Sequence, residues 1–373
     1  MCAVIEFHSM SALSIYDLSF PKLTSLLADW GEPAYRPQQI WQGLYRNFWI
    51  IPDEFTNLPP ALRQRLSDSL EFNILDPKTT FQSSDGKTVK TLFQLLDGEA
   101  IEAVLMKYDP SGPHYQSQRY HSGQARRTLC VSTQVGCAMG CVFCATGQMG
   151  FKRHLSSGEI IAQVLYYARL LHAQCEVVSN VVVMGMGEPF HNYNNTLAAI
   201  DRLNDLYGYN FGARRFTIST VGLVPAIRRF AAEKRQVNLA ISLHAADDTL
   251  RSSMLPINKR FGVDDLLEVC RDYVAVTGRR ITFEWALING VNDTPDQAHL
   301  LARKLNGILC HVNAIPLNPT KGYTGKATNR EHANEFKKIL IHSGIPCTIR
   351  LRRGIDIQAG CGQLANSTIE IKN

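Results

Sequence analysis

Residues 128–144 read Thr128-Leu-Cys-Val-Ser-Thr-Gln-Val-Gly-Cys137-Ala-Met-Gly-Cys141-Val-Phe-Cys144. The stretch opens with an apolar run, Thr128–Ser132, which has the composition and length of a buried strand. Three cysteines then follow at spacings of four and three residues. Glycines around them allow the backbone to fold tightly, so we expect a strand that leads into a compact loop with three thiols.

Apolar, strand-like runs alternate with helical stretches from this strand onward. The predicted strands are Thr128–Ser132, Asn180–Met184, Arg215–Ser219, Asn238–Leu243, Arg280–Leu287 and His311–Pro316. The predicted helices are Ser157–Ala173, Tyr193–Leu206, Val224–Glu233, Val263–Thr277, Pro295–Leu305 and Arg330–Ser343. Strict alternation of this kind indicates an α/β fold with a parallel sheet and an outer helical layer. Six units are too few for a closed eight-stranded barrel, so we predict a partial (β/α)6 barrel over residues 128–353.

The remaining chain divides into three predicted parts. Residues 1–75 have helical periodicity in Phe20–Trp30, Arg36–Phe48 and Pro60–Leu70, which predicts a small helical accessory domain. Residues 76–127 form short alternating strands and a polar linker, of which 109–127 is expected to be a loop. Residues 354–373 form a tail in which Cys361 lies between two glycines, so we expect an accessible thiol on a pliable loop.

Composition narrows the class of protein. The chain has 373 residues, of which 45% are hydrophobic and 19% charged, so it is able to bury a core and is not of the disordered class. No apolar run approaches the roughly 20 residues of a membrane span. The first ten residues lack a basic segment, so we expect no secretory signal and a reducing, cytoplasmic location for the ten cysteines. The net charge of +6 permits an acidic partner such as nucleic acid.

The three clustered cysteines predict a metal centre. Three thiolates are able to hold three irons of a 4Fe–4S cluster and leave the fourth iron open to a ligand. Electron-transfer clusters and structural zinc sites normally use four protein ligands. No fourth Cys or His follows Cys137, Cys141 and Cys144 at the usual spacing, which disfavours zinc.

Other polar residues fall at the predicted carboxyl ends of the strands, where parallel α/β folds place their chemistry. Gly187 and Glu188 lie in a glycine-rich turn after the second strand, where a carboxylate could accept from a ligand ammonium group. The later strand ends carry Ser219, Ser242, Leu243, His244 and Asn318. An ordinary turn or cap role is the alternative for each of these residues.

The complete set of motifs resembles the RlmN/Cfr family of RNA adenine methyltransferases, within the radical S-adenosylmethionine (SAM) superfamily. The resemblance runs from about residue 18 to residue 364, and it implies that residues 1–75 are the accessory RNA-contacting domain of the family. It is carried by residues 128–137, 141–151, Gly185-Met-Gly-Glu-Pro189, Ile218-Ser-Thr220, Ser242-Leu-His244, Leu255-Pro-Ile-Asn258 and Ala359-Gly-Cys-Gly-Gln-Leu364. The linker 109–127 is longer than the family pattern leads us to expect.

The resemblance implies a mechanism and a set of partners. It implies a 4Fe–4S cluster on Cys137, Cys141 and Cys144, and two SAM molecules per turnover. One methylates Cys361; the other gives the radical that activates this methyl group for addition to the adenine ring. Cys130 then helps to release the product, leaving a Cys130–Cys361 disulfide, and Glu102 accepts a proton. The implied partners are 23S rRNA and tRNA, with an electron donor such as flavodoxin or ferredoxin and a monomeric enzyme.

Alternatives remain open at this point. The family has a branch that methylates carbon 2 of an adenosine in the peptidyl transferase region and a branch that methylates carbon 8. Ile315-Pro-Leu-Asn-Pro319 resembles the carbon-2 branch. A non-catalytic, zinc-stabilised RNA-binding protein is the second alternative. For Glu102 the alternative is a solvated strand carboxylate, and basic pairs such as Lys152–Arg153 are either phosphate contacts or ordinary surface charges.

Overall fold

One ten-stranded sheet organises the protein, as a computed structural model that describes residues 13–109 and 125–365 shows. The strand order is β14-β13-β12-β11-β10-β9-β6-β5-β4-β3, and neighbours from β6 to β14 are parallel. These strands are β6 (Arg126–Cys130), β9 (Asn180–Val183), β10 (Phe216–Thr220), β11 (Asn238–Ser242), β12 (Ile281–Leu287), β13 (Cys310–Pro316) and β14 (Cys347–Ile349). The predicted parallel α/β fold is therefore confirmed, with β14 as an additional strand.

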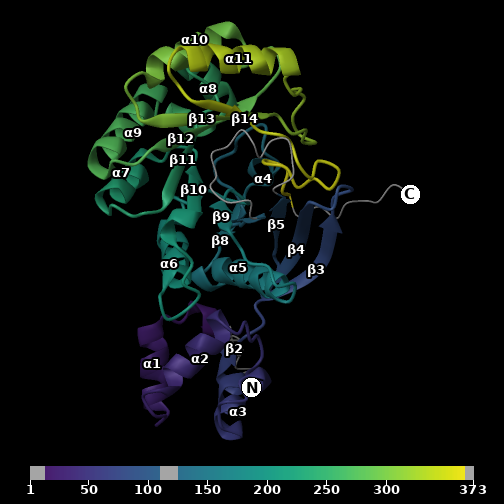
Figure 1. Ribbon diagram of the computed structural model, residues 1–373, viewed down its shortest axis with the longest axis vertical. Coiled ribbons are helices and arrows are strands. Elements are labelled where there is room, and N and C mark those ends of the chain that lie inside the picture. The colour runs from purple at the N-terminus through teal and green to yellow at the C-terminus, as the bar shows by residue number, and fades with distance from the viewer. Residues whose placement is uncertain (1–12, 110–124, 366–373) are drawn as a thin grey trace, which may run out of the picture.

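The helices lie along the outer side of the curved sheet, while α4 (Ala145–Gln148) and residues 354–365 of the C-terminal tail lie on its inner side (Figure 1). The outer helices are α5 (Ser157–His172), α6 (Tyr193–Asn204), α7 (Val224–Ala232), α9 (Val263–Thr277), α10 (Pro295–Leu305) and α11 (Arg330–His342). Local sequence explains several of their ends. Ser156 and Glu159 form a reciprocal capping box at the start of α5, and Thr294 caps α10 ahead of Pro295.

Three antiparallel strands extend the sheet beyond β6. They are β3 (Leu75–Gln82), β4 (Thr88–Leu95) and β5 (Ala100–Tyr108). In the register of the β5–β6 pair, Val104 lies opposite Cys130. Residues 110–124, most of the expected loop 109–127, lie outside the described residues. The short strands of the linker region are thus continuous with the parallel sheet.

The N-terminal helices lie at one end of the molecule, below α5 and α6 in Figure 1. They are α1 (Phe20–Asp29), α2 (Arg36–Tyr45) and α3 (Pro60–Ser69), accompanied by the short pair β1 (Leu13–Ser14) and β2 (Leu70–Glu71). Trp41 is buried and its indole N–H donates to Asp205 at 2.6 Å. Asp17 accepts from the backbone N–H of Gly158 at 2.7 Å, so polar contacts join this unit to α5 and to the end of α6.

No helix among the described residues is long and apolar enough to cross a membrane.

Candidate active site

The cysteine loop is held between two short strands that the sequence did not predict. β7 (Gln134–Gly136) pairs with β8 (Phe151–His154), and the three cysteines lie between them. Gly136 has a φ of +73°, and a Cβ atom there would lie 1.9 Å from the carbonyl oxygen of Gly150. The N–H of Cys137 donates to this same oxygen at 2.8 Å. Only glycine at residue 136 permits the close approach that closes the loop.

The three thiols of the loop fit an iron–sulfur cluster. Cys141 is buried and Cys137 and Cys144 are half-buried. Burial raises the pKa of the Cys141 thiol well above its usual value, and the neighbouring Cys144 and Cys137 raise it further. Within residues 13–109 and 125–365, no three Cys, His, Asp or Glu side chains are grouped so as to hold one metal ion. Because each cluster iron takes its own thiolate, a cluster does not require the three sulfurs to meet at one atom.

Glu188 is fixed in a turn next to this loop. Its carboxylate accepts from the backbone N–H groups of Phe190 at 3.0 Å and Val221 at 2.9 Å. Burial nevertheless raises its pKa to about 7, although these hydrogen bonds act in the opposite direction. A buried carboxylate of this kind is suited to accept from a ligand ammonium group, which would offset the cost of burial.

Gln134 positions this turn, and sequence reasoning did not single it out. Its side-chain carbonyl accepts from the N–H of Glu188 at 2.8 Å. Gly187 has a φ of +103°, and a Cβ atom there would lie 2.6 Å from Cβ and Cγ of Gln134. The backbone at Gly187 therefore packs directly against Gln134, and glycine is required for that contact.

The ends of β10 and β11 bring together four of the predicted residues. The hydroxyl oxygens of Ser219 and Ser242 lie 3.4 Å apart. Leu243 is buried, and its N–H donates to the carbonyl of Glu284. His244 accepts a hydrogen bond at Nδ1 from the N–H of Ala286 at 2.9 Å, and burial lowers its pKa to about 3. The imidazole is therefore neutral and carries its proton on Nε2.

Arg251 of α8 (Asp248–Met254) forms hydrogen bonds with both of these strand ends. Sequence reasoning did not identify it. It is fully buried. Its guanidinium donates to the carbonyls of Val221, Ser242 and Leu243 and to the side-chain oxygen of Asn258. An arginine in a short helix has no sequence signal for such a role. The structure shows it fixing the loops after β10 and β11 together with the Leu255–Asn258 stretch.

The tail places Cys361 beside the cysteine loop. The N–H of Ala145 donates to the carbonyl of Gly362 at 2.7 Å, directly after Cys144. Asn318 donates from its side chain to the carbonyl of Cys361 at 3.0 Å. Burial at the barrel mouth raises the pKa of the Cys361 thiol to about 12, with further contributions from Glu284 and Cys144. Part of the residue is nonetheless exposed to solvent.

Cys130 is the last residue of β6 and is half-buried. Burial raises the pKa of its thiol to about 12, and the second contribution is electrostatic repulsion from Cys361. Both cysteines carry free thiols in this structure. Glu284 on β12 also raises the pKa of Cys361. The Glu284 carboxylate is buried and accepts from the side chain of Asn313 at 2.5 Å. Sequence reasoning had not named Glu284, because an alternating strand gives no sign of which carboxylate faces the barrel interior.

Glu102 is not a solvated strand carboxylate. Its side chain is fully buried in β5 and lies 2.8 Å from the ammonium of Lys90, which is also fully buried. Its other oxygen accepts from the N–H of Ala365 at 2.9 Å, so Glu102 contacts the tail that bears Cys361.

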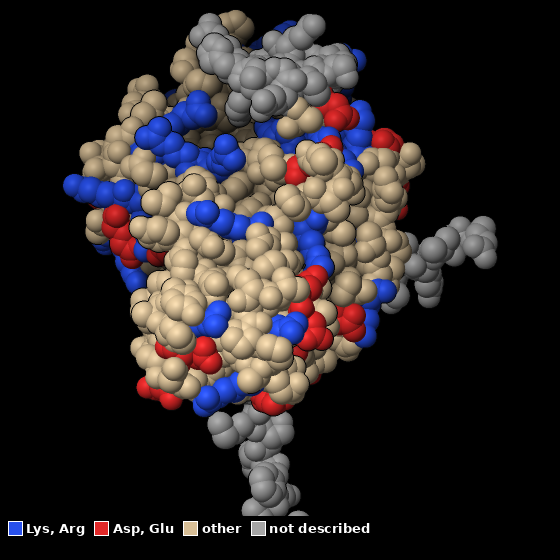
Figure 2. Space-filling model, turned by 60° about the horizontal axis from the view of Figure 1, so that its bottom comes forward, with Lys and Arg blue, Asp and Glu red and all other residues tan. Residues whose placement is uncertain are grey.

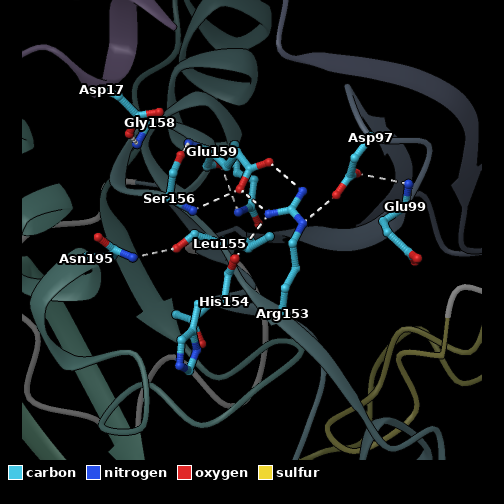
Figure 3. Close-up of polar contacts among 12 residues, drawn as sticks. Asp17, Asp97, Glu99, Arg153, His154, Leu155, Ser156, Gly158, Glu159 and Asn195 are labelled. Carbon is cyan, nitrogen blue, oxygen red and sulfur yellow. Dashed lines mark hydrogen bonds and ion pairs between the residues drawn. The ribbon is translucent and has the colours of Figure 1, made fainter. Parts of the chain in front are cut away.

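Both side chains of the basic pair Lys152–Arg153 of β8 form ion pairs within the protein. The Arg153 guanidinium lies between Asp97 and Glu159 (Figure 3), at 2.5 Å and 2.8 Å from their carboxylates. Lys152 contacts Glu99 at 2.7 Å. These ion pairs join β8 to the turn between β4 and β5 and to the start of α5. Other Lys and Arg side chains gather in a band at the upper left of the face drawn in Figure 2.

Comparison with known proteins adds family relationships to this geometry. A model described as the radical SAM superfamily matches residues 131–302, and one described as the ribosomal RNA large subunit methyltransferase N-terminal domain matches residues 13–72. The chain is 46% identical to the dual-specificity RNA methyltransferase RlmN 1 of Myxococcus xanthus over 362 residues, which cover 97% of this chain and 96% of that protein.

Two further matches span nearly the whole chain. A probable dual-specificity RNA methyltransferase RlmN of Chloroflexus aurantiacus is 46% identical, over 96% of this chain and 94% of its own. The crystal structure of a radical SAM methyltransferase from Sphaerobacter thermophilus superposes with a TM-score of 0.89 and 48% identity, covering 95% of this chain and all of that one.

Proposed function

Because this chain belongs to the RlmN family of the radical SAM superfamily, we propose that it methylates carbon 2 of an adenosine in 23S rRNA and in certain tRNAs. The observation that carries the proposal is the contact between the cysteine loop and the tail: the N–H of Ala145, next to Cys144, donates to the carbonyl of Gly362, next to Cys361, at 2.7 Å. A methyl group on Cys361 would lie beside the cysteine loop.

The cofactors of the family are a 4Fe–4S cluster and SAM, which supply the radical chemistry that an unreactive ring carbon requires. Cys137, Cys141 and Cys144 would hold the cluster. Glu188 would accept from the ammonium group of SAM, while Gly187 allows the ligand to approach the backbone. Ser219, Ser242, Leu243, His244 and Asn318 would line the rest of this site. The neutral His244 can donate from Nε2 and cannot repel the sulfonium charge.

Three residues would carry out the transfer of the methyl group and the removal of the adenine proton: Cys361, Cys130 and Glu102. The Cys361 thiol loses its proton and accepts the methyl group, for which its exposure is necessary. Cys130 would attack the sulfur of a Cys361–RNA adduct, so that a Cys130–Cys361 disulfide forms as the product leaves. Glu102 would take the adenine proton, which requires the tail to move, because its carboxylate is held by Lys90 and Ala365 in this structure.

The partners and location follow from this activity. The substrate is RNA, the electron donor is a carrier such as flavodoxin or ferredoxin, and an enzyme of ribosomal RNA works in the cytoplasm. The names of the relatives favour this proposal over a zinc-stabilised binding protein. Iron and sulfide in protein purified without oxygen would agree with it, whereas zinc alone would favour the binding protein.

Mass spectrometry of the peptide that contains Cys361 tests the proposal. Protein made with a full iron–sulfur supply should carry a methyl group on Cys361. Cys175 is a matched control because it too is exposed but lies far from the barrel mouth, after α5. It should remain unmodified. An unmethylated Cys361 in protein that contains its cluster and binds SAM would contradict the proposal.

Nucleoside analysis separates the two branches of the family. RNA from cells that lack their own enzyme, treated with this protein, should contain 2-methyladenosine. An 8-methyladenosine product would leave the methyl-cysteine route intact and would instead assign the chain to the carbon-8 branch.

A further inference from the structure

A shallow, open recess of about 330 Å³ is lined in part by the cysteine loop. Its lining residues are Ala138, Met139, Pro256, Ile257, Lys259 and Arg260. The floor is apolar, and Lys259 and Arg260 are exposed at its edge. Arg260 stacks its guanidinium over Phe261 at 5.2 Å, and no described residue forms an ion pair with either cation. The recess therefore combines an apolar floor with two unneutralised positive charges.

The floor of this recess is the cysteine loop itself. Ala138 and Met139 lie in the chain between Cys137 and Cys141, two of the three proposed cluster ligands. A Cβ atom on Gly140 would lie 3.6 Å from Pro256, and the N–H of Val142 donates to the carbonyl of Met254 at 3.0 Å. These contacts fix the loop against the segment after α8. A molecule seated in the recess would contact the residues that connect Cys137 to Cys141.

The other end of the same loop is occupied. Ala145 and Thr146, just after Cys144, donate to the carbonyls of Gly362 and Leu364 in the tail that bears Cys361. The loop thus presents its Cys144 end to the methyl-accepting tail, whereas Ala138, which is exposed, and Met139, which is half-buried, line the recess. An approach through the recess leaves the Cys361 side free for RNA.

We propose that this recess is the docking surface for a small acidic protein that carries a one-electron redox group near its surface. The inference rests on the proposed function, which requires one electron for each cleaved SAM. On docking, the carrier is oxidised by one electron, which enters the cluster held by Cys137, Cys141 and Cys144. Electron-transfer partners typically form small, transient interfaces in which charge complementarity sets the association rate.

The character of the recess favours a protein over RNA. A phosphate backbone is bound mainly by charged and hydrogen-bonding groups. Here Ala138, Met139, Pro256 and Ile257 offer no such groups, and they fit the apolar centre of a protein interface with a charged rim. The position beside the cluster loop gives an electron carrier a short path for its electron, and RNA binding does not require such a path.

Charge reversal at Lys259 and Arg260 tests this inference. The probe is a flavodoxin, reduced by its NADPH-dependent reductase and mixed with cluster-containing protein. The rate of cluster reduction is followed by absorbance and by electron paramagnetic resonance. The K259E/R260E variant should be reduced at least about tenfold more slowly at low ionic strength, and the difference should shrink as salt is added. K259Q/R260Q should be intermediate.

Two comparisons make the result decisive. Dithionite, which needs no docking surface, should reduce all variants equally and should support the same methylation of Cys361. The control R330E/K338E reverses one arginine and one lysine that are exposed on α11 in the outer layer, and its reduction by flavodoxin should match the native rate. An unchanged flavodoxin rate in K259E/R260E, or a loss of RNA binding in its place, would overturn the docking surface. Absence of methylation with dithionite in the native protein would instead overturn the proposed function.

Discussion

Lys90 and Glu102 form a fully buried ion pair, with 2.8 Å between Nζ and Oε1, and each partner holds one side of the tail that bears Cys361. Lys90 donates to the carbonyl of Gln358 at 3.3 Å, and Glu102 accepts from the N–H of Ala365 at 2.9 Å. The pair lies on adjacent strands, since Leu92 is opposite Glu102 in the β4–β5 register. Cys361 therefore lies between two tail residues, Gln358 and Ala365, that are both held by this ion pair.

Removing one member of this pair should destabilise the protein more than removing both. K90M or E102Q leaves a buried charge without its partner, and each should lower the free energy of unfolding by about 3–5 kcal/mol. The double variant K90M/E102M replaces both charges with apolar groups and should lie closer to the native protein than either single variant. Urea denaturation measures all three. Additive losses in the double variant would show that the two side chains act independently.

The same variants should loosen the tail. K90M removes the donor to Gln358, and the single amide oxygen of E102Q cannot accept from both Lys90 and Ala365. Limited proteolysis should therefore cleave the tail around Cys361 earlier than in the native protein. S84G is a control in the same region, because Ser84 meets Asp356 of the tail through its backbone N–H, which the substitution retains. Equal cleavage rates for native protein and K90M would contradict the role of the ion pair in holding the tail.

Much of the fold followed from the sequence because it is set by local pattern. The apolar run at residues 180–184 became β9, and the Ser156–Glu159 capping box marks the start of α5. The β7–β8 hairpin was not predicted, because it depends on the contact between Gly136 and Gly150 across the whole cysteine loop. Short strands such as β14 carry too few residues to show a pattern.

The sequence predicted only those residues of the site that belong to recognisable motifs. The cysteines and the Gly187–Glu188 turn are recognised by residue type and spacing. Lys90 and Arg251 are not, since a charged residue in a strand or helix is expected to face solvent. Lys90 is buried because the tail packs over β4, and Arg251 is buried because α8 directs its guanidinium toward four oxygens. Both arrangements depend on contacts between residues far apart in the sequence.

Gly136 and Gly150 provide a matched test of the cysteine loop. Both have positive φ, +73° and +76°, but an added Cβ clashes with a backbone oxygen only at Gly136. G150A should cost about 1–2 kcal/mol from backbone strain alone and should still take up iron. G136A should separate β7 from β8 and lose most of its iron and sulfide after reconstitution. Equal iron contents in two folded variants would show that the hairpin does not set the loop geometry.

Arg251 should be sensitive even to conservative substitution. R251K retains the positive charge but cannot reach the three carbonyls and the Asn258 side chain at once, so buried acceptors lose their partners. We expect a loss of about 2–4 kcal/mol in the free energy of unfolding and weaker SAM binding. Calorimetry with and without SAM measures both effects. R228K, on the exposed side of α7, should be neutral, and a similarly neutral R251K would contradict the assignment.

The raised pKa of Glu188 predicts that SAM binding depends on pH. In the folded protein without SAM this carboxyl keeps its proton to about pH 7, well above the usual value of 4.5. Its contribution to folding stability is therefore present below pH 4.5 and is lost as the pH rises through 7. A ligand ammonium group favours the ionised form, so binding SAM should reverse this loss.

From about pH 7.5 to about pH 6, SAM affinity should fall about eightfold, because the ionised fraction of a carboxyl with a pKa near 7 falls by that factor, while an α-amino group stays largely protonated. Isothermal titration of cluster-containing protein measures the affinity at each pH. E188Q cannot ionise, so it should bind SAM weakly and with little pH dependence across this range. His244 is neutral throughout, since its pKa is about 3, and so it cannot produce the same profile. A native affinity that does not change between these pH values would rule out Glu188 as the group that receives the ammonium.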